Sequence, residues 1–574
     1  MPDFPTRFVA LDVETTGTDH ETDRVIQVAA VLFDGARPLR EFGKIVRPAM
    51  PIPLRVQRMT GITQEMADAA PSFSDVAQSL VEFVGDAPLV AHNSQFDVGF
   101  VGAELRRCGM KPLSNVVYDT LELARLVRPS SRSFRLERLA ELEGVPLAGA
   151  HDAGADARAA GMLFLAYYRR LCRMNPSLIE LISSLARTCG WGLADVLAGA
   201  AAKSAALYMS GDGVAYSEPP AALKLAVMGS AAGDIPTGVV AGDEGAGEIA
   251  PISPGFVEGV LGENGRLREA LPDFEFRPQQ LQMGYLVAEA LSEGKHLLVE
   301  AGTGIGKSLA YLVPAAGFAR LNHERLIVST HTINLQEQLW EKDIPLVKDR
   351  LGIDFGTALL KGRANYACLR RWRALVARAP GMPPDEAKFV ARLAVWLSET
   401  VTGDKSELGL LPEQEPLWDA IASDADSCEG QACPYGSSCY FQAARSAAGR
   451  ADIIVVNHSL VLTDAVTGNR VLPEHSHVIF DEAHHLERSA GEHFGESVSS
   501  RHIERLLSFI ARGLPRERLE KVLGEDTVKA LDRARAAGNR AGVLLRSLAA
   551  LPLVTGGIRT AASRARGIPS PARP

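Results

Sequence analysis

Two carboxylates stand inside a strand-like run that is otherwise almost wholly apolar, FVALDVET at residues 8–15. Asp12 and Glu14 are two positions apart, and alternate side chains of a strand share a face, so both project the same way. Neighbouring negative charges repel, and folding for stability alone would avoid the pair. A divalent cation such as Mg²⁺ or Mn²⁺, which takes carboxylate oxygens, makes it favourable. The run therefore predicts a sheet that carries a metal site.

The residues around this run alternate between strand-like and helix-like segments. VIQVAAVLFD, EFGKIVRP and PLVAHN are typical of further strands, and the stretch from Asp97 to Cys108 is typical of a helix that Gly109 ends. DAGADARAAGMLFLAYYRRLCR predicts another helix with a strong apolar face. A mixed sheet flanked by helices follows, and we assign residues 1–172 to this first domain.

A second α/β pattern begins near residue 266, after a stretch rich in Gly, Ala and Pro at 173–265 that predicts a linker with helical segments. HLLVEAG, RLIVSTH, DIIVVNH and HVIFDEAH are short buried-strand runs separated by helical stretches. The fold class expected is thus an α/β multidomain protein. We assign 266–500 to the second domain, 501–553 to a partial helical insertion and 554–574 to a disordered tail.

Further acidic motifs follow the first pair. Asp97 lies in HNSQFD at the start of a helix, and Asp156 lies in HDAGAD five residues after His151. Four carboxylates can hold two metal ions that flank a scissile phosphate, and His151 is suited to accept the proton of the attacking water near neutral pH.

Other polar residues nearby are given smaller roles. His92 and Asn93 are expected to support the site or touch a nucleotide, with a purely structural role as the equal alternative. The remaining acidic residues are interpreted as solvated or capping: Asp19, Asp23, Asp34 and Asp152.

DVETTG, HNSQFD and HDAGAD resemble, in order and spacing, the three motifs of the DnaQ-like DEDDh exonucleases. The match covers roughly residues 7–170. It implies an RNase H-like fold and stepwise removal of nucleotides from a 3′ end. The resemblance also places His151 as the histidine of the DEDDh branch.

A glycine-rich loop, AGTGIGKS at 301–308, follows one of the second domain's strand-like runs and precedes a helix. This is the context that a phosphate-binding loop requires. Backbone N–H groups of such a loop approach phosphate closely, Lys307 reaches the β- and γ-phosphates, and Ser308 ligates Mg²⁺. The predicted nucleotide-binding residues of the loop are Gly302, Thr303, Gly304, Gly306, Lys307 and Ser308.

HVIFDEAHHL carries the partner motif. Asp481 is expected to hold Mg²⁺ through water, and Glu482 to polarise the water that attacks ATP. Upstream, FRPQQ resembles an adenine-reading segment in which Gln280 makes the contact. The sequence therefore predicts binding of ATP with Mg²⁺.

DEAH together with AGTGIGKS resembles superfamily 2 helicases, and KGRANYACLRR with the later VVNHSL resembles the DinG branch of the XPD-like helicases. The resemblance covers roughly 270–550 and implies a RecA-like P-loop domain with iron–sulfur and helical insertions. In order, exonuclease then helicase, the chain resembles the exonuclease-bearing form of that branch.

Four cysteines lie between the loop and DEAH, in an insertion at about 362–450: Cys368, Cys428, Cys433 and Cys439. Four thiolates can bind a [4Fe–4S] cluster or a structural zinc, and spacing alone does not decide between them. The helicase resemblance implies the cluster, with zinc as the lesser alternative. Cys108, Cys172 and Cys189 are interpreted as ordinary helix or core residues.

The residues after Asp481 contain no recognisable second RecA-like lobe, so unwinding is not expected of this chain. The leading hypothesis is an exonuclease acting on single-stranded or branched DNA in repair or replication, joined to an ATP-binding module. One alternative is that the helicase-like part only binds nucleic acid. Another is a proofreading subunit associated with a polymerase. Neither DNA against RNA nor oligomeric state follows from the residues.

The formal net charge of −8 argues only weakly against a nucleic-acid partner, because binding needs a local basic groove and not a basic total. No apolar run approaches the length of a membrane span, and the amino end lacks the pattern of a signal peptide. A cytoplasmic protein without a membrane partner is the expectation.

Overall fold

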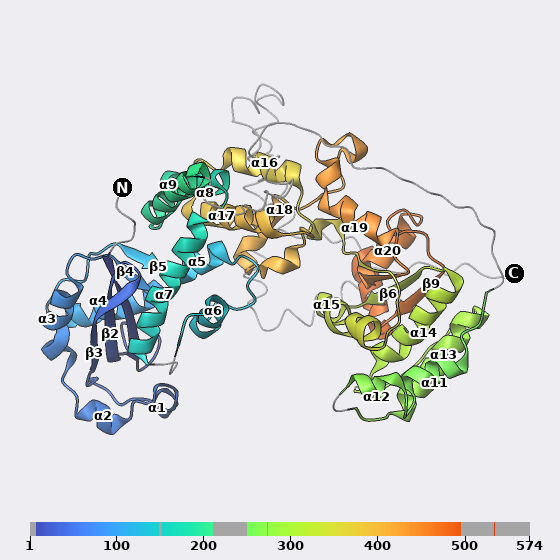
Figure 1. Ribbon diagram of the computed structural model, residues 1–574, viewed down its shortest axis with the longest axis horizontal. Coiled ribbons are helices and arrows are strands. Elements are labelled where there is room, and N and C mark those ends of the chain that lie inside the picture. Colours follow the sequence, from blue (N-terminus) through green and yellow to red (C-terminus); the bar gives the residue numbers. More distant parts are fainter. Residues whose placement is uncertain are drawn as a thin grey trace. The chain divides into compact units, whose positions relative to one another are not determined.

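The computed structural model describes residues 7–147, 152–210, 249–271, 274–302, 304–494 and 533 (Figure 1). Contacts between residues divide the chain into two compact units. The larger unit comprises 1–328, 337–456 and 472–479, and the smaller comprises 329–336, 457–471 and 480–574.

The first sheet has five strands in the order β3-β2-β1-β4-β5. β1 pairs antiparallel with β2 and parallel with β4, and both of its edges are therefore occupied. The four runs predicted as strands all form, and a short fifth strand joins at the end of the sheet. The bounds are Arg7–Thr15 (β1), Val25–Asp34 (β2), Arg37–Ile45 (β3), Leu89–Ala91 (β4) and Val117–Asp119 (β5).

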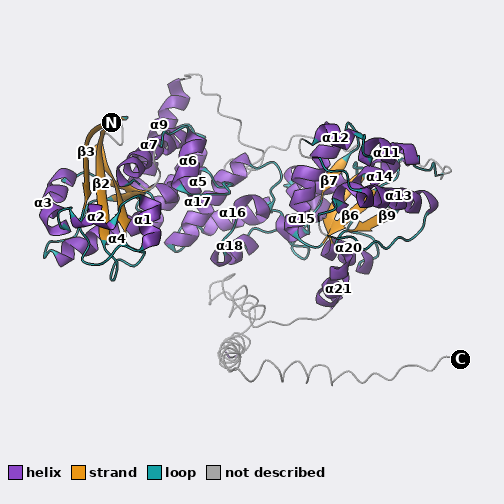
Figure 2. Cartoon of the chain, turned by 90° about the horizontal axis from the view of Figure 1, so that it is seen from below, coloured by secondary structure: helices purple, strands orange, loops and turns teal. Residues whose placement is uncertain are grey.

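Helices cover both faces of this sheet (Figures 1 and 2). Phe8 and Ala10 of β1 belong to the core that includes Phe164 of α7 (Ala153–Cys172). Val9 and Leu11, which point the other way, belong to the core that includes Phe100 of α4 (Ser94–Arg107). Because Asp12 and Glu14 share the parity of Phe8 and Ala10, they lie on the α7 face of the sheet.

The other helices of this part are α1 (Leu54–Thr60), α2 (Gln64–Asp68), α3 (Phe73–Val84), α5 (Thr120–Val127) and α6 (Leu136–Glu143). A side-chain cap marks the start of α7, and a glycine follows the end of α4. Asp152 accepts hydrogen bonds from the N–H groups of Gly154 and Ala155 at the start of α7, as the capping interpretation predicts. Gly109 follows α4 with a φ of 73°, a conformation that glycine adopts without strain.

Two more helices follow, α8 (Pro176–Cys189) and α9 (Ala194–Ser210). α8 begins at a proline behind the capping Asn175, whose side chain accepts the N–H of Ser177. The pair packs together, α9 also packs on α7, and Ile182 and Leu197 join the same core as Tyr167 of α7. Residues 211–248 of the predicted linker lie outside the described residues.

The second sheet has four strands in the order β7-β8-β6-β9, with β7 and β8 parallel. Their bounds are Leu326–Thr330 (β6), Thr357–Leu359 (β7), Ile453–Asn457 (β8) and His477–Phe480 (β9). Three of the four predicted runs thus form strands. The neighbouring helical elements are α11 (Pro254–Leu261), α12 (Arg266–Ala270), α13 (Pro278–Glu293), α14 (Lys307–Asn322), α15 (Ile333–Gln338) and the π-helical turns η1 (Leu339–Asp343) and η2 (Leu346–Arg350).

The fourth predicted run, HLLVEAG, is not a strand. Residues 295–302 carry no secondary structure, and Leu298 is 92% exposed. An apolar run becomes a strand only when another strand pairs with it, and the described sheet, β7-β8-β6-β9, contains no strand from this segment. Apolar composition alone therefore gave the wrong prediction at this segment.

Residues 363–448, called here the cysteine-bearing region, pack around three tryptophans, Trp372, Trp396 and Trp418. The Trp396 and Trp418 rings meet edge-on at 5.8 Å. The elements are η3 (Arg363–Asn365), α16 (Leu369–Arg378), α17 (Pro384–Glu399), η4 (Lys405–Leu408), η5 (Pro412–Gln414), α18 (Glu415–Asp419), η6 (Gly430–Ala432), η7 (Gly436–Ser438) and α19 (Tyr440–Ala448).

The smaller unit contains α20 (His458–Val466), η8 (Ala483–His485) and α21 (Leu486–Phe494). Apart from Arg533, the predicted helical insertion at 501–553 and the predicted tail at 554–574 lie outside the described residues. In the described part of the chain, no helix combines the length and the apolar character needed to cross a membrane.

Candidate functional site

Three of the predicted metal-binding carboxylates come together on the α7 face of the first sheet. Asp12 and Glu14 project from β1, and Asp156 projects from the first turn of α7. One carboxylate oxygen from each of the three lies within 4.8 Å of the others. Glu14 and Asp156 are buried, and Asp12 is partly exposed. This is a donor set of the size and chemistry that a hard divalent cation takes.

The electrostatics of the cluster are unfavourable without a cation. Burial raises the pKa of Asp12 well above its usual range, and the charges of Asp97, Asp156 and Glu14 raise it further. Burial, followed by the charges of Asp156 and Asp152, raises the pKa of Glu14 to about 7. Every one of these influences acts in the same direction, and a bound positive charge would oppose all of them.

Asp97 stands beside this cluster on the first turn of α4. Its Oδ1 accepts the backbone N–H of Val13 at 3.1 Å, between Asp12 and Glu14 in sequence. Burial again raises its pKa above the usual range, and the backbone N–H of Val13 offsets that rise in part. The hydrogen bond ties the start of α4 to the strand that carries the other acidic residues.

The start of α4 is fixed by residues on the neighbouring strand end. Asn93 adopts the left-handed conformation, with a φ of 69°. The carboxylate of Asp119 accepts the N–H groups of Asn93 and Ser94 at 3.2 and 2.8 Å. Asp119 is not among the predicted site residues, although an aspartate between a strand and a helix is a signal for a cap.

His92 supports the same turn from inside the protein. Its Nδ1 lies 2.9 Å from the hydroxyl of Thr120, and its Nε2 lies 2.9 Å from the carbonyl oxygen of Phe134. Burial lowers the pKa of His92. Both ring nitrogens are thus engaged by the protein, which favours the supporting role over contact with a nucleotide. His151, the predicted proton acceptor, lies outside the described residues.

The acidic residues given smaller roles lie in turns. Asp23 accepts the N–H of Asp19 and the hydroxyl of Thr16, and Asp19 accepts the N–H of Glu21. Asp34 is exposed at the end of β2. These contacts agree with the solvated or capping interpretation.

The phosphate-binding loop has the backbone that its glycines predict. Gly304 and Gly306 have φ values of 83° and 80°, which favour glycine, and Lys307 begins α14 directly behind them. N–H groups at a helix start are suited to phosphate. Gly302 and Ser308 flank these residues in the described chain, and Thr303 lies outside the described residues.

Two residues of α13 and its cap hold this loop. Gln280, predicted to read adenine, is buried, and its Nε2 donates to the carbonyl oxygen of Gly306 at 2.9 Å. The guanidinium of Arg277 donates to the carbonyl oxygen of Gly304. The Arg277 contact was not predicted, because it depends on where α13 lies in the fold and no sequence pattern around Arg277 indicates it.

The DEAH residues lie in the smaller unit. The N–H of Asp481 donates to the carbonyl oxygen of Ser329 at 2.8 Å, and Glu482 has a φ of 54°. The imidazole of His484 lies 3.3 Å from the Glu482 carboxylate. A non-glycine residue adopts the left-handed region only when the surrounding structure holds it there, so the backbone of this turn is fixed by its neighbours.

The four predicted ligand cysteines form no disulfide. Burial raises the pKa of Cys439, and the charges of Cys368 and Cys428 add to that rise, so these three sulfurs interact. A hydrogen bond from the Gly430 N–H, followed by Arg363, lowers the pKa of Cys428. Cys433 packs at the edge of the same core. Thiolates are soft donors that suit a thiophilic metal or cluster. Among the described residues, only Asp12, Glu14 and Asp156 bring three ligand atoms within 4.8 Å of one another, and the four sulfurs are not such a group.

Family models match three stretches of the chain. The exonuclease model RNase_T matches residues 9–164, the DEAD/DEAH box helicase model matches 282–376, and the DEAD_2 model matches 424–503. Asp12, Glu14, Asp97 and Asp156 lie inside the first match, the phosphate-binding loop inside the second, and three of the four cysteines with DEAH inside the third.

Curated relatives match across most of the chain. It is 32% identical to the 3′-5′ exonuclease DinG of Bacillus subtilis over 86% of this chain and 51% of that protein. It is 25% identical to the 3′-5′ exonuclease DinG of Staphylococcus aureus over 90% of this chain and 54% of that protein. It is 39% identical to the ATP-dependent DNA helicase YoaA of Escherichia coli over 42% of this chain and 38% of that protein.

The chain thus spans about half the length of the two DinG relatives. Among solved structures, the zinc-bound E. coli ExoI-ssDNA complex overlaps 31% of this chain and 45% of its own, at 24% identity and a TM-score of 0.27. In this chain, an exonuclease match thus precedes DEAD/DEAH box helicase and DEAD_2 matches, and its curated relatives include proteins named 3′-5′ exonuclease DinG and ATP-dependent DNA helicase YoaA.

Proposed function

We propose that this protein is a metal-dependent exonuclease that removes nucleotides from the 3′ ends of DNA. The observation that carries the proposal is the buried cluster of Asp12, Glu14 and Asp156, whose oxygens lie within 4.8 Å of one another while burial and mutual repulsion raise the pKa of the β1 pair. The match of the exonuclease model to residues 9–164 supports the same conclusion.

In this proposal Asp12, Glu14, Asp97 and Asp156 hold two divalent cations. Bound there, Mg²⁺ or Mn²⁺ supplies charge stabilisation to the phosphate and lowers the pKa of water. The protein's own part is to hold the oxygens in place: β1 fixes two of them, and the Val13 N–H orients the Asp97 carboxylate. His151, placed by its sequence motif, would accept the proton of the attacking water.

DNA is the proposed substrate because the relatives bear the names of a 3′-5′ exonuclease and of a DNA helicase. A single strand or a branched end is the form that the two modules would share, and repair or replication is the setting in which such ends arise. A proofreading subunit of a polymerase is the weaker candidate, since it does not account for the helicase domains.

The decisive test is the double substitution Asp12→Ala and Glu14→Ala. The purified variant should lose degradation of a 5′-labelled single strand in Mg²⁺ or Mn²⁺, by about 1,000-fold or more, because a bound metal supplies several kcal/mol of stabilisation and each 1.4 kcal/mol is tenfold in rate. Asp34→Asn, which removes an exposed carboxylate of the neighbouring strand, is the matched control and should retain the wild-type rate. Wild-type degradation by the double variant would refute the proposal.

We further propose that the second module binds ATP with Mg²⁺. The left-handed glycines of the loop and Lys307 at the start of α14 support a phosphate site, and Ser308 is the loop's proposed Mg²⁺ contact. For the smaller unit, we propose the roles that the motif predicts: Asp481 for Mg²⁺ and Glu482 for the attacking water. Gln280 holds the loop through Gly306, and an adenine contact is a second role for the same side chain.

Hydrolysis separates an ATPase from a module that only binds nucleic acid. DNA-stimulated release of phosphate that is lost in Lys307→Ala would support the ATPase. Binding of DNA without any turnover would favour the binding-only alternative, and unwinding is not part of the proposal.

For the cysteines we propose a [4Fe–4S] cluster held by Cys368, Cys428, Cys433 and Cys439. The interaction among three of the thiols and the match of the DEAD_2 model to residues 424–503 support it. Protein purified without oxygen should be brown, with broad absorbance near 400 nm and about four iron atoms per chain. A colourless protein that carries zinc would establish the alternative.

A further inference from the structure

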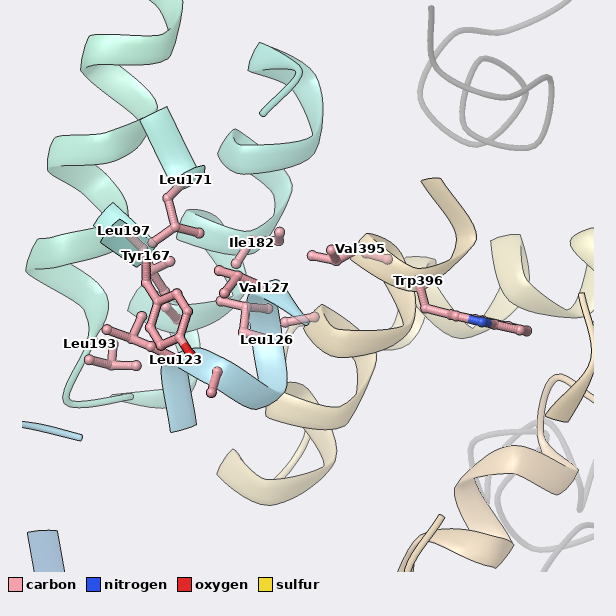
Figure 3. Close-up of a cluster of buried hydrophobic side chains, with 14 of the residues drawn as sticks. Leu123, Leu126, Val127, Tyr167, Leu171, Ile182, Leu193, Leu197, Val395 and Trp396 are labelled. Carbon is pink, nitrogen blue, oxygen red and sulfur yellow. The ribbon is translucent and has the colours of Figure 1, made fainter. Parts of the chain in front are cut away.

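Helix α17 of the cysteine-bearing region packs against the exonuclease side of the larger unit, on α5 and α8. Figure 3 shows Val395 of α17 facing Leu126, Val127 and Ile182, while Trp396 points away from them. On the other side of α17, the Trp396 ring meets the ring of Trp418 in α18. The carbonyl oxygen of Trp418 accepts the N–H of Ile421 at 2.9 Å, and the carbonyl oxygen of Ile421 accepts the N–H of Cys368 at 2.7 Å. α17 therefore connects the surroundings of the cysteines with the exonuclease domain.

Two cations one turn apart on α17 add polar contacts to this apolar seam. Nζ of Lys388 lies 2.6 Å from Glu122 of α5 and 5.9 Å from the centre of the Trp191 ring. Trp191 itself donates to Glu122 at 2.8 Å. Lys388 is about one third exposed, so this pair contributes little beyond orientation.

Arg392 differs because it is buried. Its guanidinium donates to the carbonyl oxygen of Pro129 at 2.7 Å and to that of Leu408, one on each side of the interface. It also lies 5.9 Å from the centre of the Phe134 ring. Burial lowers its pKa to about 10, so the group remains charged at neutral pH while it is almost fully removed from water.

A buried guanidinium is costly unless its donors are used. Nη2 of Arg392 donates both of these bonds, whereas its Nε has no hydrogen-bond partner. A lysine side chain ends one bond short of Nη2, so we expect it not to bridge the two carbonyls. Arg392 thereby fixes the loop between α5 and α6, which runs from Pro129 to Phe134. The same loop reaches the metal site, because the carbonyl oxygen of Phe134 holds His92 at 2.9 Å.

From His92 the contacts continue to a metal-binding carboxylate. His92 directly precedes Asn93, whose left-handed backbone opens α4, and Asp97 stands on the first turn of that helix. Hydrogen bonds and the loop backbone thus link Arg392 to His92, and Asp97 follows His92 by five residues, on the first turn of α4. Outer contacts of this kind set the orientation of a metal ligand and hence its affinity.

We propose that Arg392 is a positioning residue of the exonuclease site: from α17 it fixes the 129–134 loop and, through His92, the helix start that carries Asp97. The cysteine-bearing region would then support metal binding in the exonuclease domain. This inference rests on the proposed function, since it requires that the four carboxylates bind the metal.

The test measures Mn²⁺ binding directly, without catalysis, by electron paramagnetic resonance of the full chain. Signal retained by the Asp12→Ala and Glu14→Ala variant is background from other sites and is subtracted. Arg392→Lys keeps the charge and loses the two-sided bridge, and it should weaken Mn²⁺ binding about tenfold, the lower end of what outer contacts of metal ligands contribute. Arg170→Ala removes an exposed ion pair with Glu399 at the same α17 interface, and it should bind Mn²⁺ as the wild type does.

His92→Gln tests the middle of the series and leaves α17 untouched, which keeps the test decisive if Arg392→Lys does not fold. It should weaken Mn²⁺ binding by a similar factor. The double variant Arg392→Lys with His92→Gln should bind no worse than the weaker single variant, because both changes release the same helix start, whereas independent effects would multiply.

The outcomes separate the two proposals. A wild-type chain without Mn²⁺ binding that depends on Asp12 and Glu14 overturns the proposed function and this inference with it. Binding by the wild type that is unchanged in His92→Gln, or in a folded Arg392→Lys, overturns this inference alone. Multiplied effects in the double variant also overturn it, because they would show that Arg392 and His92 act separately.

Discussion

The strand that carries the first carboxylates and the segment that leads into the phosphate-binding loop are supported in opposite ways. β1 is paired on both edges, and Leu11, midway along it, is fully buried. The segment at 295–302 is unpaired, and its Leu298 is 92% exposed. Both segments lead into a recognisable motif. The difference teaches that a motif identifies chemistry, whereas neighbouring strands determine whether its residues are held in place.

The consequences for the two sites differ accordingly. In the exonuclease domain, packing holds carboxylates close together, and the pKa of Glu14 rises to about 7. The free energy of folding is therefore less favourable than it would be without this crowding of carboxylates. In the phosphate-binding loop, side chains of α13 and its cap, Gln280 and Arg277, hold the backbone through single hydrogen bonds. We expect the first site to be preorganised and the second to depend on local contacts.

The largest effect should come from the remaining carboxylates. If the exonuclease site is held by its own sheet, Asp97→Ala and Asp156→Ala should each reduce exonuclease rate by about 1,000-fold, because each removes a proposed metal contact worth several kcal/mol. ATP hydrolysis, measured on the same samples, should change less than twofold. A parallel loss of both activities would break the comparison, since the two sites would then not be independent.

The second effect concerns packing on β1. Leu11→Ala should lower the stability of the exonuclease domain by roughly 2–5 kcal/mol, since it leaves a cavity in a close-packed core. Thermal unfolding followed by circular dichroism would show this as a lower melting temperature for that domain. A loss below about 1 kcal/mol would contradict full burial of the side chain.

The third effect is the dependence of stability on pH and metal. Because the folded pKa of Glu14 is about 7 and its ordinary value is 4.5, the folded state holds a proton that the unfolded chain has lost between those values. Without metal, stability should therefore fall as pH rises from about 4.5 to 7. Mg²⁺ at about 100 times its dissociation constant should restore about 2.7 kcal/mol at pH 7. In the variant Asp12→Asn with Glu14→Gln the metal effect should vanish and the pH effect should shrink, because the buried Asp97 keeps a raised pKa. A wild-type stability that instead rises over this range would contradict the raised pKa of Glu14.

How far the sequence predicted these features depends on how local their causes are. The shared face of Asp12 and Glu14 follows from strand periodicity, and the register of β1 bears it out. The glycine-rich loop follows from its motif, and two of its glycines, Gly304 and Gly306, have the left-handed conformation that glycine adopts without strain. The roles of Asp119 and Arg277 depend on which distant segment lies beside them, and no local pattern contains that information. The burial of HLLVEAG was predicted wrongly for the same reason, because a buried strand requires a distant segment that pairs with it and covers it.

The smallest effect is the sharpest test of the comparison, since it repeats one substitution in the other region. Leu298→Ala removes the same atoms as Leu11→Ala, yet a side chain that is 92% exposed has few contacts to lose, so stability should change by less than about 0.5 kcal/mol. Leu326→Ala in β6, where the side chain is fully buried, is the positive control and should cost roughly 2–5 kcal/mol. Hydrogen exchange of peptides from β6 and β8 reports the stability of the second sheet in all three proteins. A cost of 2 kcal/mol or more for Leu298→Ala would mean that the segment before the loop is packed as firmly as β1, and the contrast between the two motifs would disappear.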